Sequence, residues 1–115
     1  MVLVGDVSNR IAILVDDMAD TCGTLVKAAQ TVKEHGAIKI IAIVTHAILS
    51  GAACKIVEKS ELTMLVVTNT VPHEGKKVRC KKLRTIDISP TLAEACRRTH
   101  NGESVSFLFS YAPPS

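Results

Sequence analysis

The sequence predicts an α/β fold in which a parallel sheet is flanked by helices. Hydrophobic residues make up 47% of the 115 residues but aromatic residues only 3%, so the core must be built from Val, Ile, Leu and Ala, the usual filling of parallel sheets. Short apolar runs alternate along the chain with segments of helical periodicity, which favours parallel strands joined by right-handed crossovers. The length suits a single domain over residues 1–115.

The first predicted unit is a strand, a loop and a helix. Residues 10–17 form a continuous apolar run that ends in two acids, as a buried parallel strand does where it emerges at the edge of a sheet. A short polar loop follows over 18–23. Apolar residues recur at helical spacing over 24–35, and Gly36 supplies the C-terminal stop.

The same alternation continues towards the end of the chain. Further strands are expected at 39–45, 64–68 and 83–88, with a short helix over 52–60 and a last helix from Ser89 to about His100. Ser89 is predicted as the N-cap of the last helix, since Pro90 follows it at the first helical position. Two more apolar segments, 2–4 and 104–111, are candidates for an edge strand and a terminal strand.

The loop after the first strand has the composition of a phosphate-binding site. It reads Val15-Asp-Asp-Met-Ala-Asp-Thr-Cys-Gly-Thr24 and lies beyond the carboxyl end of a strand, where ligands bind in parallel sheets. Small residues and a glycine at the start of a helix let backbone N–H groups converge on one anion, and the hydroxyls of Thr21 and Thr24 add donors.

Two adjacent carboxylates in this loop point to a different part of a ligand. Asp16 and Asp17 would repel a phosphate, but they can accept hydrogen bonds from sugar hydroxyls or hold a divalent metal ion. A phosphate at one end and a vicinal diol at the other describe a ribose phosphate. The composition is equally compatible with a structural interpretation, in which Asp20 or Thr21 caps the helix and the two acids are merely exposed.

Polar residues also follow the second and third predicted strands. His46 is a candidate base, although a single histidine at the end of a strand is more often a hydrogen-bonded structural residue. Ser50-Gly51 lies just beyond it. The residues Thr68, Asn69 and Thr70 can line the same cleft or simply satisfy backbone groups.

Several other functions find little support. Basic residues gather in 76–84 and no aromatic residue interleaves them, so a solvated loop is favoured over a nucleic-acid-binding module. Cys22, Cys54, Cys80 and Cys96 have no C-x-x-C spacing and are expected to be free thiols. The chain has neither a nucleotide P-loop nor a dinucleotide-binding glycine motif. It has no apolar stretch long enough to span a membrane, so a soluble cytoplasmic protein is expected.

Residues 15–24 closely resemble the ribose 5-phosphate loop of ribose-phosphate pyrophosphokinases, which are members of the type I phosphoribosyltransferase superfamily. Further segments resemble the C-terminal half of that family in the same order: Val4-Gly-Asp-Val7, Thr45-His46, Val67-Thr-Asn-Thr-Val-Pro72, Ile86-Asp-Ile-Ser89, Leu92-Ala-Glu-Ala95 and Arg97-Arg-Thr-His-Asn-Gly-Glu-Ser-Val-Ser106. The resemblance covers essentially the whole chain. It implies a phosphoribosyltransferase-type parallel sheet flanked by helices.

The resemblance also implies an activity and a set of residue roles. The family transfers pyrophosphate from Mg-ATP to ribose 5-phosphate, giving 5-phosphoribosyl 1-pyrophosphate, and works as a homo-oligomer. The residues expected to hold the 5-phosphate are Asp20, Thr21, Cys22, Gly23 and Thr24. Asp16 and Asp17 are expected to contact the ribose hydroxyls and are candidate ligands of Mg²⁺. Ser104 and Phe109 are expected to contribute to a regulatory site for phosphate or ADP between subunits.

No catalytic residue is expected in this chain. In the family an N-terminal domain supplies the ATP contacts, metal ligands and a mobile basic loop, so the chain alone is expected to be inactive. An alternative is a non-catalytic regulatory or assembly partner of full-length synthetase subunits, although such proteins have a degraded loop and this loop is intact. A nucleic-acid-binding module and an independent phosphoribosyltransferase are more remote alternatives.

Overall fold

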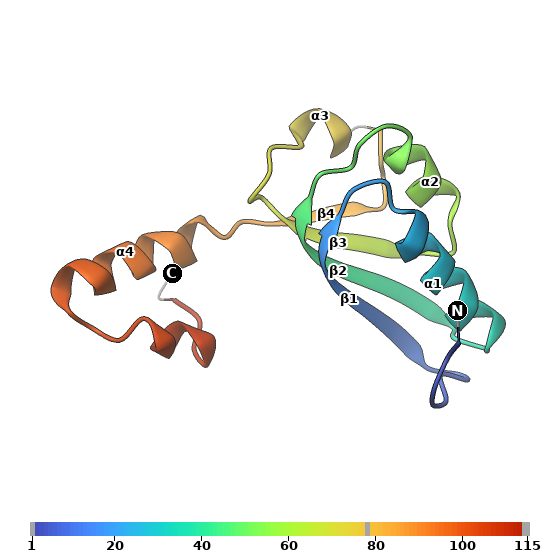
Figure 1. Cartoon of the computed structure of the whole chain (residues 1–115), viewed down its shortest axis with the longest axis horizontal. Helices are drawn as coiled ribbons and strands as arrows, with labels where there is room; N and C mark the ends of the chain where they lie inside the picture. The colour runs from blue at the N-terminus through green and yellow to red at the C-terminus, as the bar shows by residue number, and fades with distance from the viewer. Residues whose placement is uncertain (1, 78, 114–115) are drawn as a thin grey trace.

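A computed structural model of the protein describes residues 2–77 and 79–113 and has a parallel α/β architecture (Figure 1). Within these residues one sheet has the strand order β1-β2-β3-β4, and all three neighbouring pairs are parallel. Its strands are β1 (Ile11–Ala19), β2 (Lys39–Ala47), β3 (Met64–Thr68) and β4 (Leu83–Ile86). The helices are α1 (Gly23–Glu34), α2 (Ala53–Lys59), α3 (Glu74–Lys77) and α4 (Ser89–Asn101), followed by the 3₁₀-helix η1 (Ser106–Phe109). The predicted fold class is therefore confirmed.

The two faces of the sheet differ. Helices α1 and α2 lie on the same face (Figure 1), because strands in sequential order joined by crossovers of one hand place their connections on one side. On the opposite face, Ile11, Ile13 and Val15 of β1 are 55%, 57% and 77% exposed. β1 thus alternates between a face covered by helices and an open face, as the two-residue period of a strand requires.

The core lies between the sheet and the helices α1 and α2. It consists of small and branched aliphatic residues with three cysteines, as the composition predicted. Its largest fully buried members include Ile40, Leu62, Leu65 and Leu83. Burying each such side chain stabilises the fold by about 1.5–3 kcal/mol relative to leaving it in water.

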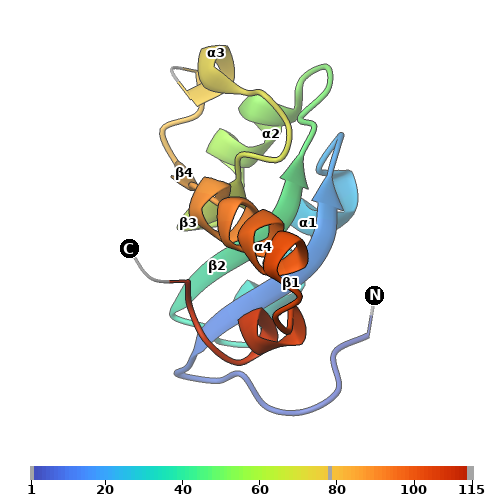
Figure 2. The ribbon, with the colours of Figure 1, turned by 90° about the vertical axis from the view of Figure 1, so that its left-hand side faces the viewer.

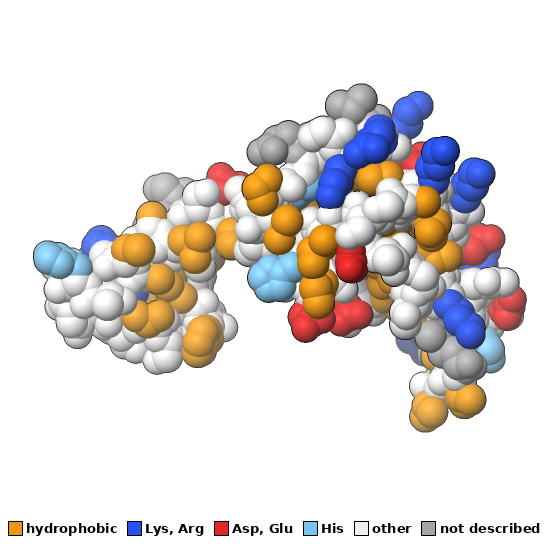
Figure 3. Space-filling view, turned by 45° about the horizontal axis from the view of Figure 1, so that its top comes forward, with side chains coloured by type: hydrophobic (Ala, Val, Ile, Leu, Met, Phe, Trp, Pro, Cys, Tyr) orange, Lys and Arg blue, Asp and Glu red, His pale blue; other side chains and the backbone are white. Residues whose placement is uncertain are grey.

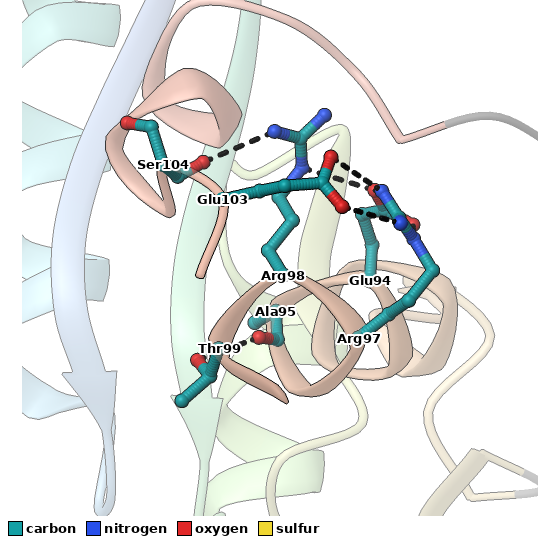
Figure 4. Close-up of polar contacts among 7 residues, drawn as sticks. All are labelled: Glu94, Ala95, Arg97, Arg98, Thr99, Glu103 and Ser104. Carbon is teal, nitrogen blue, oxygen red and sulfur yellow. Dashed lines mark hydrogen bonds and ion pairs between the residues drawn. The ribbon is translucent and has the colours of Figure 1, made fainter. Parts of the chain in front are cut away.

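Residues 89–111, the C-terminal arm, project away from the sheet (Figure 1), and α4 is nearest the viewer when the molecule is seen from that side (Figure 2). The arm is held together mainly by its own side chains. Glu94 accepts hydrogen bonds from Arg97 at 2.7 Å and from Arg98 at 3.0 Å, and Arg97 also binds Glu103 at 2.7 Å (Figure 4). Arg98 also lies 4.2 Å from the ring centroid of Phe107.

Several predicted boundaries were wrong. β1 and β2 each continue two residues beyond the predicted ends, to Ala19 and Ala47, because the two strands still pair there. Residues 2–4 form no strand, and the predicted strand over 104–111 contains η1 instead. That segment contacts α4 through Arg98 and pairs with none of the described strands.

The start of α4 also differs from the prediction. Ser89 lies inside the helix, whose N-cap is Ile88, and no side chain caps the helix from that position. Instead, the carboxylate of Asp87 accepts a hydrogen bond from the Ser89 N–H at 2.9 Å. The predicted proline in the first turn is confirmed.

Candidate functional site

The turn between β1 and α1 encloses a hollow of about 230 Å³ at the carboxyl end of β1. The residues that line it are Asp16, Met18, Ala19, Asp20, Thr21, Cys22, Gly23, Thr24 and Leu25. Every residue that the sequence predicted for the site lines this hollow, with the exception of Asp17. Because the hollow is smaller than the roughly 300–1,000 Å³ pockets of drug-sized ligands, it suits a small metabolite such as a sugar phosphate.

Backbone geometry turns the chain sharply from strand to helix at this point. Cys22 has a φ of +68°, in the left-handed region, and α1 begins at Gly23 directly after it. The Val26 N–H donates to the Cys22 carbonyl at 3.0 Å, whereas the N–H groups of the first turn have no acceptor within the helix. A Cβ placed at Gly23 would meet no atom within 4 Å, so the space beside this residue is open.

The first turn of α1 favours an anion in two further ways. It contains no acidic residue, so the positive end of the helix dipole is not opposed from within the helix. In the described part of the chain, the hydroxyls of Thr21 and Thr24 make no hydrogen bond within the protein. Both hydroxyls are therefore available to a ligand. The interpretation that Asp20 or Thr21 caps α1 is wrong, since the N-cap is Cys22 and no side chain caps it.

The two adjacent acids lie on opposite faces of β1. Asp16 lines the hollow, and its carboxylate accepts a hydrogen bond from the Asp17 N–H at 2.8 Å. Asp17 is the next residue of the strand, so its side chain points to the open face of the sheet. The two-residue period of a strand could have shown this from the sequence, because the predicted strand 10–17 already contained both acids.

The charged group of Asp20 is tied to the following strand-helix connection. Its carboxylate accepts a hydrogen bond from the Ser50 hydroxyl, and its carbonyl accepts one from the Ser50 N–H at 3.0 Å. Sequence reasoning placed Ser50 beyond the second strand but did not detect this pairing. The two residues are 30 positions apart and no local pattern links them.

Cys22 lines the hollow with an uncharged thiol. Burial, together with smaller effects of the nearby Cys54, Cys80 and Asp20, raises the pKa of its thiol to about 11. The thiol is therefore protonated at neutral pH, which makes it a poor nucleophile. All four cysteines are free, as predicted.

His46 is adjacent to the hollow but does not line it. It pairs with Met18 in the sheet, and its Nδ1 lies 2.7 Å from the Thr70 hydroxyl. The hydroxyls of Thr68 and Thr70 in turn donate to the carbonyl of Thr45, at 2.6 Å and 3.2 Å. This arrangement favours the structural interpretation of His46 and of the threonines after β3.

The described residues do not form a complete site for a metal ion. Within the residues that the structure describes, no group of three or more His, Cys, Asp or Glu side chains could hold a metal. Asp16 is the one candidate ligand of the predicted pair that faces the hollow. Mg²⁺ is often held by one or two carboxylates together with substrate oxygens, so Asp16 fits a metal that arrives with its substrate.

The candidate regulatory residues lie in the C-terminal arm. The Ser104 carbonyl accepts a hydrogen bond from Arg98 at 3.1 Å (Figure 4). The Ser104 hydroxyl lies 2.8 Å from that of Ser106. Phe109 is 87% exposed. Neither residue lines the hollow between β1 and α1.

Lysine and arginine side chains gather on the surface around α2 and α3 (Figure 3). Several of them are engaged within the chain: Lys76 donates to the Ile48 carbonyl, Lys82 to that of Ser60 and Arg84 to that of Lys81. A second hollow of about 520 Å³ lies there, lined by Gly51, Ala52, Cys54, Lys55 and Arg79. These contacts tie Lys76, Lys82 and Arg84 to backbone carbonyls of the same chain, and the solvated loop expected over 76–84 stays a prediction. None of the described helices is long and apolar enough to cross a membrane.

Comparison with known proteins places the chain in a family. A model of the phosphoribosyl synthetase-associated domain matches residues 1–110. The chain therefore belongs to the phosphoribosyl synthetase-associated domain family, which confirms the resemblance seen in the loop after β1.

Individual relatives agree with this assignment. The chain is 62% identical over 113 residues to ribose-phosphate pyrophosphokinase 2 of Schizosaccharomyces pombe, covering 98% of this chain and 35% of that protein. It is 56% identical over 110 residues to ribose-phosphate pyrophosphokinase A of Dictyostelium discoideum, covering 96% of this chain and 35% of that protein. The chain thus spans about a third of the length of these relatives.

A solved structure shows the same fold. The phosphoribosylpyrophosphate synthetase of Mycobacterium smegmatis matches with a TM-score of 0.80 at 37% identity, covering 86% of this chain and 33% of that one. The predicted phosphoribosyltransferase-type sheet is accordingly confirmed by a synthetase structure.

Proposed function

We propose that this domain supplies the ribose 5-phosphate site of a ribose-phosphate pyrophosphokinase, which transfers pyrophosphate from ATP to ribose 5-phosphate and gives 5-phosphoribosyl 1-pyrophosphate. The observation that carries the proposal is the hollow between β1 and α1. It brings together the open first turn of a helix, two hydroxyls without partners in the described chain and one carboxylate from the end of the strand.

Each part of the hollow suits one part of this substrate. The N–H groups from Gly23 onwards and the hydroxyls of Thr21 and Thr24 are donors for the 5-phosphate. Asp16 is an acceptor for the hydroxyls of the ribose ring. We assign that contact to Asp16 rather than Asp17, whose side chain points to the other face of the sheet.

The chain alone should bind this substrate without converting it. Transfer of a pyrophosphoryl group depends on positioning the two substrates and on neutralising negative charge with metal ions and basic groups. Among the described residues, the ones that line the hollow include no lysine and no arginine. ATP, Mg²⁺ and the cationic groups must therefore be brought in by other parts of the enzyme, with Asp16 as the carboxylate this domain can offer to the metal.

Assembly with other subunits belongs to the same proposal. Phe109 and Tyr111 are 87% and 61% exposed at the end of an arm that projects from the sheet, and exposed aromatic residues are typical of subunit contacts. A regulatory site for phosphate or ADP at Ser104 and Phe109 would then lie between subunits. The alternative of a non-catalytic assembly partner is disfavoured by the intact loop.

Calorimetric titration with ribose 5-phosphate tests the binding role. The variant Thr21→Ala/Thr24→Ala removes both free hydroxyls, and because a hydrogen bond to a charged group contributes about 1.5–3 kcal/mol, we expect the affinity to fall at least roughly tenfold. The matched control is Thr31→Ala, whose hydroxyl bonds to the Lys27 carbonyl of α1 outside the hollow. Equal binding by the loop variant and the control would refute the assigned phosphate site.

A further inference from the structure

The segment 48–50, which follows β2, is hydrogen-bonded to the loop after β1. The N–H groups of Ile48 and Leu49 both donate to the Ala19 carbonyl, at 2.9 Å and 3.0 Å. The Ser50 N–H donates to the Asp20 carbonyl at 3.0 Å, and the Ser50 hydroxyl donates to the Asp20 carboxylate. Four hydrogen bonds from three consecutive residues thus end on two consecutive residues of the loop.

This convergence depends on an unusual backbone conformation. Leu49 has a φ of +54°, in the left-handed region that residues other than glycine rarely adopt. A left-handed residue in a turn directs successive N–H groups to one point, which here is the Ala19 carbonyl. The Leu49 side chain is only 2% exposed, so its burial in the core holds the turn in place.

The segment is fixed from its other side as well. The ammonium group of Lys76, in the short helix α3, donates to the carbonyl of Ile48. The Lys76 N–H donates to the His73 carbonyl at 2.9 Å, and the His73 ring bonds to Thr85 of β4 at 2.9 Å. These contacts therefore link the loop after β1 to β4, the strand at the opposite edge of the sheet.

The contact between Ser50 and Asp20 has an electrostatic consequence. Asp20 lines the hollow beside the donors for the 5-phosphate, where a carboxylate free to turn towards the phosphate would repel it. The Ser50 hydroxyl holds one oxygen of the Asp20 carboxylate on the side of the segment 48–50. A hydrogen bond to this oxygen both orients the carboxylate and reduces its effective charge towards the ligand.

We propose that Ser50 is a positioning residue for the binding of ribose 5-phosphate, acting through Asp20. This inference rests on the proposed function and specifies how the loop is held ready for its ligand. Ser50 does not line the hollow, so it acts on the ligand through the shape of the loop and the orientation of the Asp20 carboxylate.

The test compares Ser50→Ala and Ser50→Thr with the wild-type chain by calorimetric titration with ribose 5-phosphate. We expect Ser50→Ala to weaken binding roughly ten- to a hundredfold, as for the loss of a hydrogen bond to a charged group. Ser50→Thr keeps the hydroxyl and should restore binding to within about threefold of wild type. The control is Thr99→Ala, which removes an exposed hydroxyl bonded to a backbone carbonyl in the C-terminal arm and should bind like wild type.

A double-mutant cycle between Ser50 and Asp20 distinguishes a positioning role of Ser50 from a general disturbance of the fold. If Ser50 acts through Asp20, then adding Ser50→Ala to Asp20→Asn should change the affinity little, because the pair it breaks is already altered. Additive losses would overturn the proposal, and so would wild-type binding by Ser50→Ala. Should Ser50→Ala fail to fold, Ser50→Cys keeps the size of the side chain with a much weaker donor and takes its place.

A measurement on the chain without ligand tests the role of Ser50 separately from the proposed binding of ribose 5-phosphate. Absence of ribose 5-phosphate binding by the wild-type chain would count against the binding role itself. The amide NMR signals of Thr21 and Gly23 in the free chain would still decide the role of Ser50. We expect them to shift and to exchange faster with solvent in Ser50→Ala, and not in Thr99→Ala. Unchanged signals in Ser50→Ala would overturn the proposal.

Discussion

The Nε2 atom of His73 lies 2.9 Å from the hydroxyl of Thr85, and its Nδ1 atom lies 2.8 Å from the carbonyl oxygen of Val71. Because a carbonyl can only accept, Nδ1 carries the proton and Nε2 accepts from the threonine. His73 is 8% exposed, and its two partly buried hydrogen bonds join the loop after β3 to β4.

Replacing His73 by leucine should therefore destabilise the domain. The change removes both hydrogen bonds, which are partly buried, and a typical intramolecular hydrogen bond contributes about 0.5–1.5 kcal/mol to stability. Urea unfolding followed by circular dichroism measures the free energy of unfolding. The control is His100→Leu at the exposed end of α4, for which a change within about 0.5 kcal/mol is expected. Equal stability of the two variants would contradict the assigned role.

As the pH falls, the amides of the C-terminal arm should lose their protection against hydrogen exchange before those of the sheet do. The hydrogen bond from Arg97 lowers the pKa of Glu94 below its ordinary value of 4.5, and it lowers the pKa of Glu103 in the same way. A carboxyl whose pKa is lower in the folded state stabilises that state fully above its unfolded pKa. The contribution is lost as the pH falls through the folded value. The window is therefore below about pH 4.5.

Amide hydrogen exchange from pH 6 down to pH 3, corrected for the intrinsic rates, measures this effect. Protection of α4 should fall across the lower part of that range, while protection of β2 stays constant. Glu94→Gln should show weaker protection of α4 already at pH 6. Glu61→Gln, at an exposed position outside the arm, serves as the control. Parallel loss in α4 and β2 would mean that the ion pairs of the arm do not set its stability.

Local patterns predicted an element well where its apolar run has the same bounds as the element itself. The bounds of β3 agree with the prediction to the residue, since its apolar run stops where the strand stops. The end of β1 was missed because it depends on pairing with β2, as between Met18 and His46. The segment 104–111 was missed for a similar reason, since its structure depends on Arg98 of α4 rather than on a neighbouring strand.

Some features of the candidate site could likewise be predicted from the sequence, and others could not. The part proposed to bind phosphate could be located from the sequence because Asp20 to Thr24 are contiguous, and all five residues line the hollow. The orientation of Asp17 was missed because the two acids were taken together as the end of the strand, although adjacent residues of a strand face opposite sides. The support from Ser50 was missed because it bridges two loops that only the folded sheet brings together.

The four thiols should differ sharply in their reactivity towards iodoacetamide. This difference tests whether the Cys22 thiol that lines the site is buried and uncharged. Cys22, Cys54 and Cys80 are buried and Cys96 is exposed, and burial raises the pKa of both Cys22 and Cys80. Since the thiolate is the reactive form, iodoacetamide at pH 8 should label the native chain at Cys96 and the urea-unfolded chain at all four cysteines. Peptide mass spectrometry identifies the labelled residues, and Cys96→Ser should remove the native label. Rapid labelling of Cys22 in the native chain would mean that the loop opens readily, and a preformed phosphate site would then be untenable.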